Sequence, residues 1–284
     1  MNDNTALNTI LTFVDNQLCQ WKKSKQFKKS PLYIFISGPQ GSGKSYSSKK
    51  IGEHITTNYS DISSLAISID DFYLKREDQI QLQNKYSNNK LLDGRGLPGT
   101  HDLPLLSQFV ESTLSYTNSS LNVPHYDKSK YGGLGDRAPT STQKKLPIDV
   151  IIFEGWFVGY ESISRNMKKT LDENMIDINK YLLHYSKLLW DNDLISSIGI
   201  VFATNKIHNV YNWRKQQERE LIEQTGNGMT DEQVEKFIDR YWPCYEEYFE
   251  DFIKSKKLGN IATLTVTINI DRNLEYSEIS LHNQ

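Results

Sequence analysis

The sequence predicts an α/β fold in which helices alternate with the strands of a mostly parallel sheet. Apolar runs at residues 32–37, 62–69, 147–156 and 197–203 have the length and β-branched content of buried strands. Polar or amphipathic segments long enough to form helices separate these runs, among them a polar, helix-like segment at residues 75–89. The first three runs lead into glycine or acidic residues, which in open α/β sheets lie at the edge where ligands bind.

The segment before the first strand predicts an amphipathic helix over residues 5–22. Its apolar positions recur at helical spacing and are Leu7, Ile10, Leu11, Val14, Leu18 and Trp21. Residues 22–29 then form a basic linker with five lysines in eight residues. We expect this linker to be solvated, with a binding tail as the alternative.

A glycine-rich loop, Gly38-Pro39-Gln40-Gly41-Ser42-Gly43-Lys44-Ser45, follows the first strand and satisfies the pattern G-x-x-x-x-G-K-[ST] at every fixed position. A helix predicted over residues 45–59 comes directly after it. This order aims backbone N–H groups and a helix N-terminus at phosphate oxygens. Lys44 would reach the β- and γ-phosphates, and the hydroxyl of Ser45 would bind Mg²⁺. The loop therefore predicts a phosphate site for ATP and Mg²⁺.

Two aspartates, Asp70 and Asp71, follow the predicted strand at 62–69. A carboxylate at this strand end points into the ligand crevice, where it can accept the proton of an attacking hydroxyl. The alternative is that one aspartate caps the next helix and the other is solvated. We favour Asp70 as the catalytic base over Asp71.

An acid also closes the almost uninterrupted apolar run at 147–156, which reads as a buried parallel strand. This acid, Glu154, should lie at the same sheet edge as the phosphate loop. There it can orient Mg²⁺ or its water shell. An acid that only ends a strand is the alternative.

Two further loops can present an acceptor. Residues 92–102 hold three glycines and a proline, with Arg95 and His101 on a tightly turned backbone suited to gripping a small anion. The alternative is that His101 or Asp102 caps the helix that starts near Pro104.

Residues 123–137 form the second loop, in which glycines alternate with charged and tyrosine side chains. Its candidate substrate-binding residues are Tyr126, Lys128 and Arg137. A hairpin insertion would have the same composition.

The second half of the chain predicts a helix over 177–191, the strand at 197–203 and a long helix over 209–224. Asn205-Lys206 suggests the guanine-specific pattern N-K-x-D, but His208 stands at the position of the aspartate, which excludes a GTPase on this ground. Arg214 at the start of the long helix can stabilise charge on the transferring phosphoryl group. The competing interpretation is a solvated helix face rich in glutamates.

The remaining segments are a break at residues 226–229, a capping box at Thr230–Gln233 that opens a helix, and Pro243, which should kink or end that helix. Residues 261–270 predict a strand that passes through a turn into a frayed edge at 276–281.

Composition narrows the class of protein. The chain has 284 residues, is 37% apolar and carries a formal net charge of -2, so we expect no nucleic-acid or membrane partner. Its two cysteines, Cys19 and Cys244, have no metal-binding spacing. The N-terminus has no basic leader, and no apolar run nears the ~20 residues of a bilayer span. We expect a cytoplasmic protein, with the nucleus as an alternative and the oligomeric state left open.

Together the motifs resemble those of one family, the fungal probable ATP-dependent kinases that are similar to plant-type D-glycerate 3-kinase. The resemblance spans about residues 32 to 268. In chain order, its motifs are the phosphate loop, Ser68–Tyr73, Gly94–Gly96, Gly99–Asp102, Tyr126–Ser129, Gly135–Arg137, Phe153–Trp156, Trp213-Arg214 and Met229–Glu232. The chain is more distantly similar to the pantothenate kinase, uridine kinase and phosphoribulokinase group.

The resemblance implies a single phosphate-loop NTPase domain over residues 1–284, a three-layer sandwich with a mostly parallel sheet and a helical lid at about 205–255. Residues 1–30 would be its N-terminal helix and linker. In the wider kinase group the aspartate after the second strand is the catalytic base, and it matches Asp70. The strand-end glutamate matches Glu154.

We interpret the chain as an ATP-dependent kinase that phosphorylates a hydroxyl of a small, anionic, D-glycerate-like metabolite. The alternatives are an ATP-binding switch without kinase activity and a pantothenate- or nucleoside-type kinase. The predicted catalytic residues are Lys44, Asp70, Glu154 and Arg214, and the predicted metal ligands are Ser45 and Glu154. The predicted substrate-binding residues are Arg95, His101, Tyr126, Lys128 and Arg137.

Overall fold

The computed structural model describes residues 5–24, 27, 29–115, 118–164, 171–226 and 228–282. Three positions of the predicted basic linker, Lys25, Gln26 and Lys28, lie outside these residues, as does Asn227 in the predicted break at 226–229. Within the described ranges, every helix falls short of the combined length and hydropathy that a membrane span requires.

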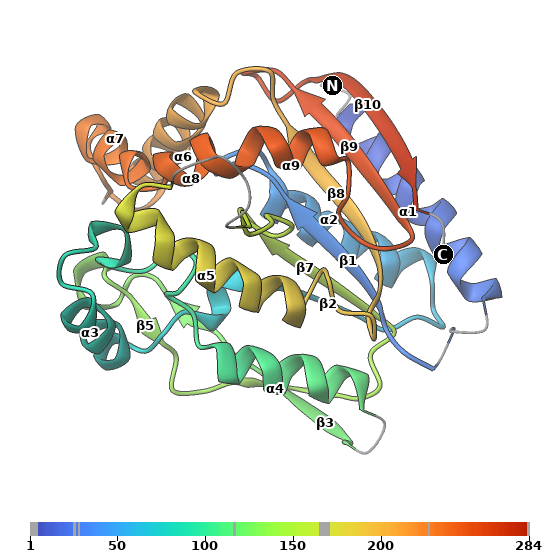
Figure 1. Cartoon of the computed structure of the whole chain (residues 1–284). Helices are drawn as coiled ribbons and strands as arrows, with labels where there is room; N and C mark the ends of the chain where they lie inside the picture. Colours follow the sequence, from blue (N-terminus) through green and yellow to red (C-terminus); the bar gives the residue numbers. More distant parts are fainter. Residues whose placement is uncertain are drawn as a thin grey trace.

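A six-stranded sheet forms the centre of the described part of the chain (Figure 1). In spatial order its strands are β10 (Leu274–Leu281), β9 (Ala262–Ile268), β8 (Ser196–Ala203), β1 (Leu32–Ser37), β7 (Val150–Gly155) and β2 (Ser64–Ser68). Neighbouring strands are parallel except β9 and β10, which are antiparallel. The predicted α/β class with a mostly parallel sheet is confirmed. The carboxyl ends of β1, β2 and β7 meet at one edge, where the predicted site residues follow them.

Helices cover both faces of this sheet, which gives the predicted three layers (Figure 1). Tyr33 and Phe35 of β1 pack into one apolar cluster with residues of α4 and α5, whereas Ile34 and Ile36 pack into a second cluster with residues of α1 and α2. Successive side chains of a strand point to opposite faces, so a strand buried on both sides is apolar throughout. The helices are α1 (Thr5–Lys23), α2 (Lys44–Asn58), α3 (Arg76–Lys85), α4 (Leu103–Leu114), α5 (Glu173–Leu188), α6 (Asn209–Thr225), α7 (Asp231–Asp239), α8 (Trp242–Cys244) and α9 (Glu250–Ser255).

The loop at residues 123–137 is a small antiparallel hairpin, the alternative that its composition left open. Strand β4 (Tyr126–Asp127) pairs with β5 (Asp136–Arg137). A second pair outside it joins β3 (Ser120–Val123) to β6 (Thr142–Lys145). The hairpin tip contains a 3-10 turn at Lys130–Gly133, with Gly132 at φ 64° and Gly133 at φ 94°.

Three segments differ from their predicted form. The polar helix expected to run to residue 89 ends at Lys85. Pro243 stands in the first turn of a new helical stretch, where its missing N–H costs no hydrogen bond, and this stretch continues through a π-helical turn (Tyr245–Phe249) into α9. The predicted frayed edge at residues 276–281 is a paired strand, because β10 pairs with β9 as far as Leu281.

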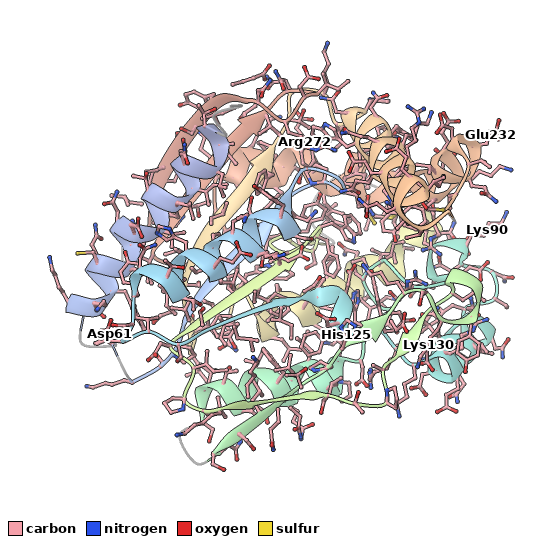
Figure 2. All side chains as sticks on the ribbon, turned by 180° about the vertical axis from the view of Figure 1, so that it is seen from behind. Asp61, Lys90, His125, Lys130, Glu232 and Arg272 are labelled. Carbon is pink, nitrogen blue, oxygen red and sulfur yellow. The ribbon has the colours of Figure 1, made fainter. Side chains whose placement is uncertain are left out.

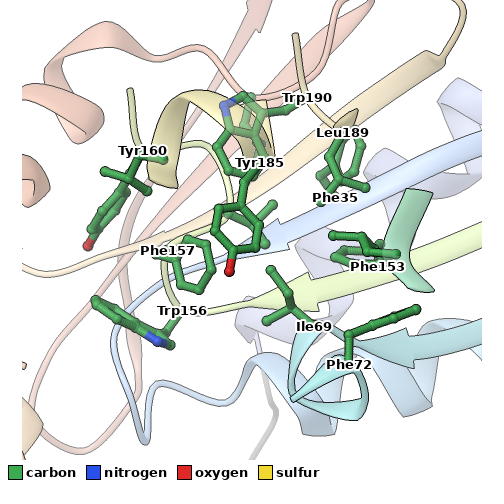
Figure 3. Close-up of a cluster of buried hydrophobic side chains, with 14 of the residues drawn as sticks. Phe35, Ile69, Phe72, Phe153, Trp156, Phe157, Tyr160, Tyr185, Leu189 and Trp190 are labelled. Carbon is green, nitrogen blue, oxygen red and sulfur yellow. The ribbon is translucent and has the colours of Figure 1, made fainter. Parts of the chain in front are cut away.

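An aromatic core lies beneath the ligand edge of the sheet (Figure 3). Phe72 stacks on Phe153 with ring centroids 6.1 Å apart, and Trp156 meets Phe157 edge to face at 5.4 Å. Phe72 follows Asp70 along the chain, and Phe153 and Trp156 stand on either side of Glu154. Such contacts add packing energy beyond the buried area, so the backbone that presents both acids is firmly held.

Candidate active site

The phosphate loop has the backbone that its glycines permit. Gly38 and Gly41 lie at φ 150° and 79°, and a Cβ at either position would come within 2.5 Å of the Cβ of Phe202 or Trp213. The buried Lys44 returns over the loop and its ammonium donates to the carbonyl of Pro39 at 2.9 Å. Burial lowers the pKa of Lys44, and the carboxylates of Glu154 and Asp70 oppose this shift. The backbone N–H groups and Lys44 thus converge on one small cradle.

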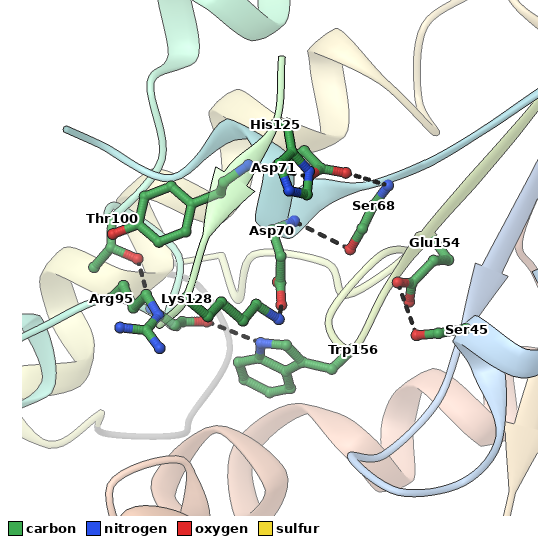
Figure 4. A network of polar contacts seen from close by, with 12 residues as sticks. Ser45, Ser68, Asp70, Asp71, Arg95, Thr100, His125, Lys128, Glu154 and Trp156 are labelled. Carbon is green, nitrogen blue, oxygen red and sulfur yellow. Dashed lines mark hydrogen bonds and ion pairs between the residues drawn. The ribbon is translucent and has the colours of Figure 1, made fainter. Parts of the chain in front are cut away.

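Glu154 lies beside this cradle, in register with Ile36 of β1 and Ser68 of β2. The hydroxyl of Ser45 donates to its Oε1 at 3.0 Å (Figure 4). Burial raises the pKa of Glu154, and Lys44 lowers it in part. A hydroxyl and a carboxylate oxygen are ligands that Mg²⁺ prefers, and the phosphates of ATP and water would complete the shell. The pair therefore fits the predicted metal position.

The two aspartates after β2 have different surroundings. Asp71 accepts from the backbone N–H groups of Ser68 and Tyr126, each at 3.3 Å, and lies 3.3 Å from Nδ1 of His125. With the Ser68 hydroxyl, which accepts from the N–H of Asp70, it forms a capping box on the 3-10 turn Ile69–Phe72. Burial raises the pKa of Asp71. Asp71 holds the turn and ties it to the hairpin.

The Asp70 side chain points away from Asp71 and toward Lys128 (Figure 4), and its charge also acts on Lys44 and Glu154. Its Oδ2 lies 2.6 Å from the ammonium of Lys128 on the hairpin. Burial alone would raise the pKa of Asp70, but Lys128, together with smaller effects that include a hydrogen bond from the Tyr73 hydroxyl, outweighs burial, and the pKa is lower than its ordinary value. Residues from β7, α2, the turn after β2 and the hairpin thus meet at one point.

The first glycine loop, residues 92–102, is held beside these residues by hydrogen bonds from several elements. Trp156 donates from Nε1 to the carbonyl of Gly96 at 2.9 Å, and the N–H of Gly96 donates to the Thr100 hydroxyl at 2.9 Å (Figure 4). Arg95 donates to the carbonyls of Gly133 and Leu134 at the hairpin tip. Arg95 therefore joins the two predicted acceptor loops, which the sequence presents as separate segments.

His101 is buried, and its Nδ1 is hydrogen-bonded to the Tyr185 hydroxyl at 2.9 Å. The N–H of Gly99 donates to the same hydroxyl oxygen at 3.0 Å. Nε2 is buried and has no hydrogen-bond partner in the described ranges. Burial lowers the pKa of His101 to about 3. His101 thus offers a neutral ring nitrogen that is buried and, among the described residues, unpaired. The helix-capping alternative belongs to Asp102, which accepts from the N–H of Leu105.

Arg137 and Tyr126 face each other across the small hairpin. Arg137 donates to the carbonyl of Tyr73 at 3.0 Å and to Asp102 at 2.9 Å, which clamps the hairpin to the start of α4. Tyr126 is buried, and the Arg95 guanidinium lies 5.7 Å from its ring centroid. Both residues hold the acceptor loops together.

The Arg214 side chain is not directed at the phosphate loop in this structure. Its guanidinium pairs with the buried Glu218 at 2.7 Å and lies over the Phe237 ring. Its backbone N lies 3.4 Å from the place that a Cβ of Gly41 would take. Arg214 thus pairs with a glutamate of its own helix, but Glu218 is buried, unlike the solvated helix face of the competing interpretation.

Two residues that touch the phosphate loop have no motif that would reveal them. The Tyr245 hydroxyl accepts from the N–H of Gln40 at 3.1 Å and donates to its Oε1 at 2.6 Å. Arg272, in the turn between β9 and β10, donates to the carbonyl of Gly41 at 2.6 Å (Figure 2). A pocket of about 210 Å³ opens beside Arg272, between the loop, α1 and α6. The sequence gives no signal for either contact, because each joins segments more than 200 residues apart.

Known proteins are similar to this chain in sequence and in fold. No family model matches it. It is 47% identical over 277 residues to the probable ATP-dependent kinase TDA10 of Saccharomyces cerevisiae, covering 95% of each sequence. It is 35% identical to the chloroplastic D-glycerate 3-kinase of Arabidopsis thaliana, covering 85% of this chain and 53% of that protein. The solved D-glycerate 3-kinase from Cryptococcus neoformans has a TM-score of 0.84 at 32% identity, covering 96% of this chain and 98% of that one.

The near full-length match to the yeast protein agrees with the motifs and with the three-layer fold. The chain belongs to the family of ATP-dependent small-molecule kinases that includes TDA10 and the D-glycerate 3-kinases.

Proposed function

We propose that this kinase transfers the γ-phosphoryl group of ATP to a hydroxyl of a small hydroxy acid of the D-glycerate type. The observation that carries the proposal is the meeting of Lys44, Asp70 and Glu154 with Lys128, a cation from the acceptor side. The names of the plant and Cryptococcus relatives support the choice of acceptor. None of the relatives reported above supports an ATP-binding switch.

The phosphate side would use the loop from Gly38 to Ser45. Its N–H groups and Lys44 would hold the β- and γ-phosphates, and Ser45 and Glu154 would hold Mg²⁺. Mg²⁺ supplies neutralisation of the charge that develops on the transferring group. Glu154 also orients Ser45, since the two side chains are already hydrogen-bonded.

Asp70 would act as the general base. The acceptor oxygen bonds to the γ-phosphorus while the bond from that phosphorus to the β,γ-bridging oxygen breaks. The hydroxyl proton passes to the Asp70 carboxylate, and ADP leaves with the electron pair of the broken bond. Asp71 is unsuited to this role, because backbone N–H groups and His125 already engage its carboxylate.

The acceptor side would be built from both loops. Lys128 and Arg95 supply positive charge for a carboxylate, and Nε2 of His101 supplies a neutral polar atom for an acceptor hydroxyl. Arg137 and Tyr126 position these groups by holding the hairpin against the sheet.

The helical region at about 205–255 would act as the lid. Tyr245 contacts Gln40 of the phosphate loop, while Arg240 donates to the carbonyls of Asp93 and Arg95 in the acceptor loop. A segment that touches both substrate sites can couple their closure, which excludes water from the reaction. Arg214 would reach the phosphoryl group only if lid movement released it from Glu218.

The test is ADP release with a panel of D-glycerate, glycerol, pantothenate and uridine. We expect D-glycerate to give the largest stimulation. Stimulation by pantothenate or uridine alone would indicate a pantothenate- or nucleoside-type kinase instead. ATP binding without stimulation by any compound would favour the switch.

The base is tested by Asp70→Asn, which we expect to keep ATP affinity while lowering transfer by ~10² or more. Asp71→Asn is the matched control. It should retain most of its turnover but lower the free energy of unfolding, because it weakens the capping of the 3-10 turn. Equal turnover in Asp70→Asn and the wild-type protein would contradict the assignment.

A further inference from the structure

The ion pair between Lys128 and Asp70 joins a fixed partner to a movable one. Asp70 follows the buried Ile69, and its side chain is only 25% exposed. The Lys128 side chain is 56% exposed although its ammonium reaches Oδ2 at 2.6 Å. A lysine side chain has a flexible four-carbon stem, so its ammonium can move into solvent or onto another anion without backbone movement. Lys128 can therefore exchange partners while Asp70 stays in place.

The backbone that carries Lys128 is held at several points. The N–H of Tyr126 donates to Asp71, and Arg137 is paired with Asp102. Arg95 fixes the far end of the hairpin through the carbonyls of Gly133 and Leu134. The three acceptor-side cations thus differ, because Arg95 and Arg137 are bonded to groups that hold loops together, whereas Lys128 is bonded to the proposed base.

This pair hinders the base in the absence of an acceptor. The ammonium takes a lone pair of Oδ2 and lowers the proton affinity of the carboxylate. A general base needs a hydrogen bond to the hydroxyl that it deprotonates. Within the described ranges, the other titratable or charged groups that interact with Asp70 are Lys44 from α2, Glu154 from β7, His101 from the first glycine loop, Asp71 and Tyr73 from the turn after β2, and Tyr241 from the helical region after α7.

We propose that the carboxylate of the acceptor draws Lys128 away from Asp70, so that binding of an anionic acceptor itself frees the base. This inference rests on the proposed function and deepens it, since it makes Lys128 the residue that selects acids over neutral polyols. A neutral polyol has no charge with which to replace Asp70, so it meets a base that is still paired. The carboxylate of an acid forms a new ion pair with Lys128, which offsets the loss of the ion pair between Lys128 and Asp70.

The experiment compares D-glycerate with glycerol, which replaces the carboxylate by a neutral hydroxymethyl group. Acceptor binding is measured by calorimetry, and kcat and KM by ADP release, for the wild-type protein, Lys128→Met and Lys128→Arg. Lys130→Met is the matched control, because it removes the same charge two residues along the same hairpin, where the ammonium lies 3.4 Å from the Arg137 carbonyl (Figure 2). Circular dichroism and the thermal midpoint verify that each variant is folded.

We expect Lys128→Met to lower kcat/KM for D-glycerate by ~10- to 100-fold, the value of a charge-assisted contact. The kcat for glycerol should rise, because Asp70 is no longer paired. Lys128→Arg should recover part of the preference for the acid, and Lys130→Met should behave as the wild-type protein. Equal losses on both acceptors, or no loss on the acid, would overturn the role of Lys128.

The measurements of acceptor binding and of phosphoryl transfer distinguish a failure of this inference from a failure of the proposed function. If D-glycerate binds and Lys128→Met weakens that binding, but no transfer occurs, the role of Lys128 in acid recognition stands and the proposed function fails. If transfer occurs and Lys128→Met keeps the same preference, the proposed function stands and this inference fails. If D-glycerate does not bind to the wild-type protein, both fail.

Discussion

At the residue scale, hydrogen bonding decides which of two similar neighbours can do chemistry. Asp70 and Asp71 are adjacent in the chain, but backbone N–H groups engage Asp71, whereas side chains, the Lys128 ammonium and the Tyr73 hydroxyl, engage Asp70. The sequence favoured Asp70 by its position after the strand, and the geometry supports this choice without testing the chemistry. The Lys128 partner was not foreseeable, because it comes from a hairpin 58 residues further along the chain.

His101 gives a prediction at the same scale, for stability against pH. Its imidazole titrates near 6.5 when unfolded, whereas burial lowers the pKa of His101 to about 3 in the folded protein. Between these values the unfolded state binds more protons, so the stability present above pH 6.5 is lost as the pH falls toward 3. From pH 7.5 to 5.5 the wild-type protein should lose about 1.4 kcal/mol more than His101→Gln. Urea unfolding at both pH values measures the difference, and identical pH slopes would contradict the buried neutral imidazole.

At the scale of elements, local signals predict most of the fold. The first strand was predicted at the bounds that β1 has, and the helix after the loop was predicted within one residue of α2. Both depend on local residues, namely an apolar run, a glycine loop and a helix start. The stretch from Trp242 to Ser255 lies in the helical lid region that the family resemblance implies, but its local pattern did not predict a helix, because Pro243 also signals a helix end. Whether a proline ends one helix or starts the next is decided by tertiary packing.

The helical region proposed as the lid gives a prediction at this scale, because its π-helical turn presents Tyr245 to the phosphate loop. Tyr245→Phe removes the acceptor of the Gln40 N–H and the donor to its side chain. We expect a rise in the KM for ATP of roughly 3- to 10-fold, from the loss of about 1 kcal/mol of loop ordering.

Tyr248→Phe is the control for this change. It lies in the same turn, but its hydroxyl donates to Asn179 of α5. Steady-state kinetics with varied ATP measure the effect, and equal KM values in the two variants would show that Tyr245 does not order the loop.

At the scale of the whole molecule, ATP should stabilise the fold, because the loop that binds it connects the central strand to α2. At 100 times its Kd a ligand adds about 2.7 kcal/mol, which for a chain of this size corresponds to roughly 5–10 °C in Tm. We expect this rise with ATP and Mg²⁺, and a smaller one after EDTA. In Glu154→Gln the difference that EDTA makes should shrink, since one of the two proposed metal ligands is weakened. A thermal scan checks this, and a rise that EDTA leaves unchanged in the wild-type protein would contradict the metal position.

The order of strands in the sheet also has a consequence during synthesis. Strand β1 is made first, yet it lies between β7 and β8, and the nearer of these along the chain starts about 110 residues after β1 ends. At ~5–20 residues per second the ribosome needs roughly 5 to 20 seconds to supply that partner. Throughout this time the nascent chain carries Leu32–Ser37, fully buried in the native sheet, with neither neighbour available. The strand that presents the phosphate loop is therefore also the segment with the greatest need of chaperone protection before the chain is complete.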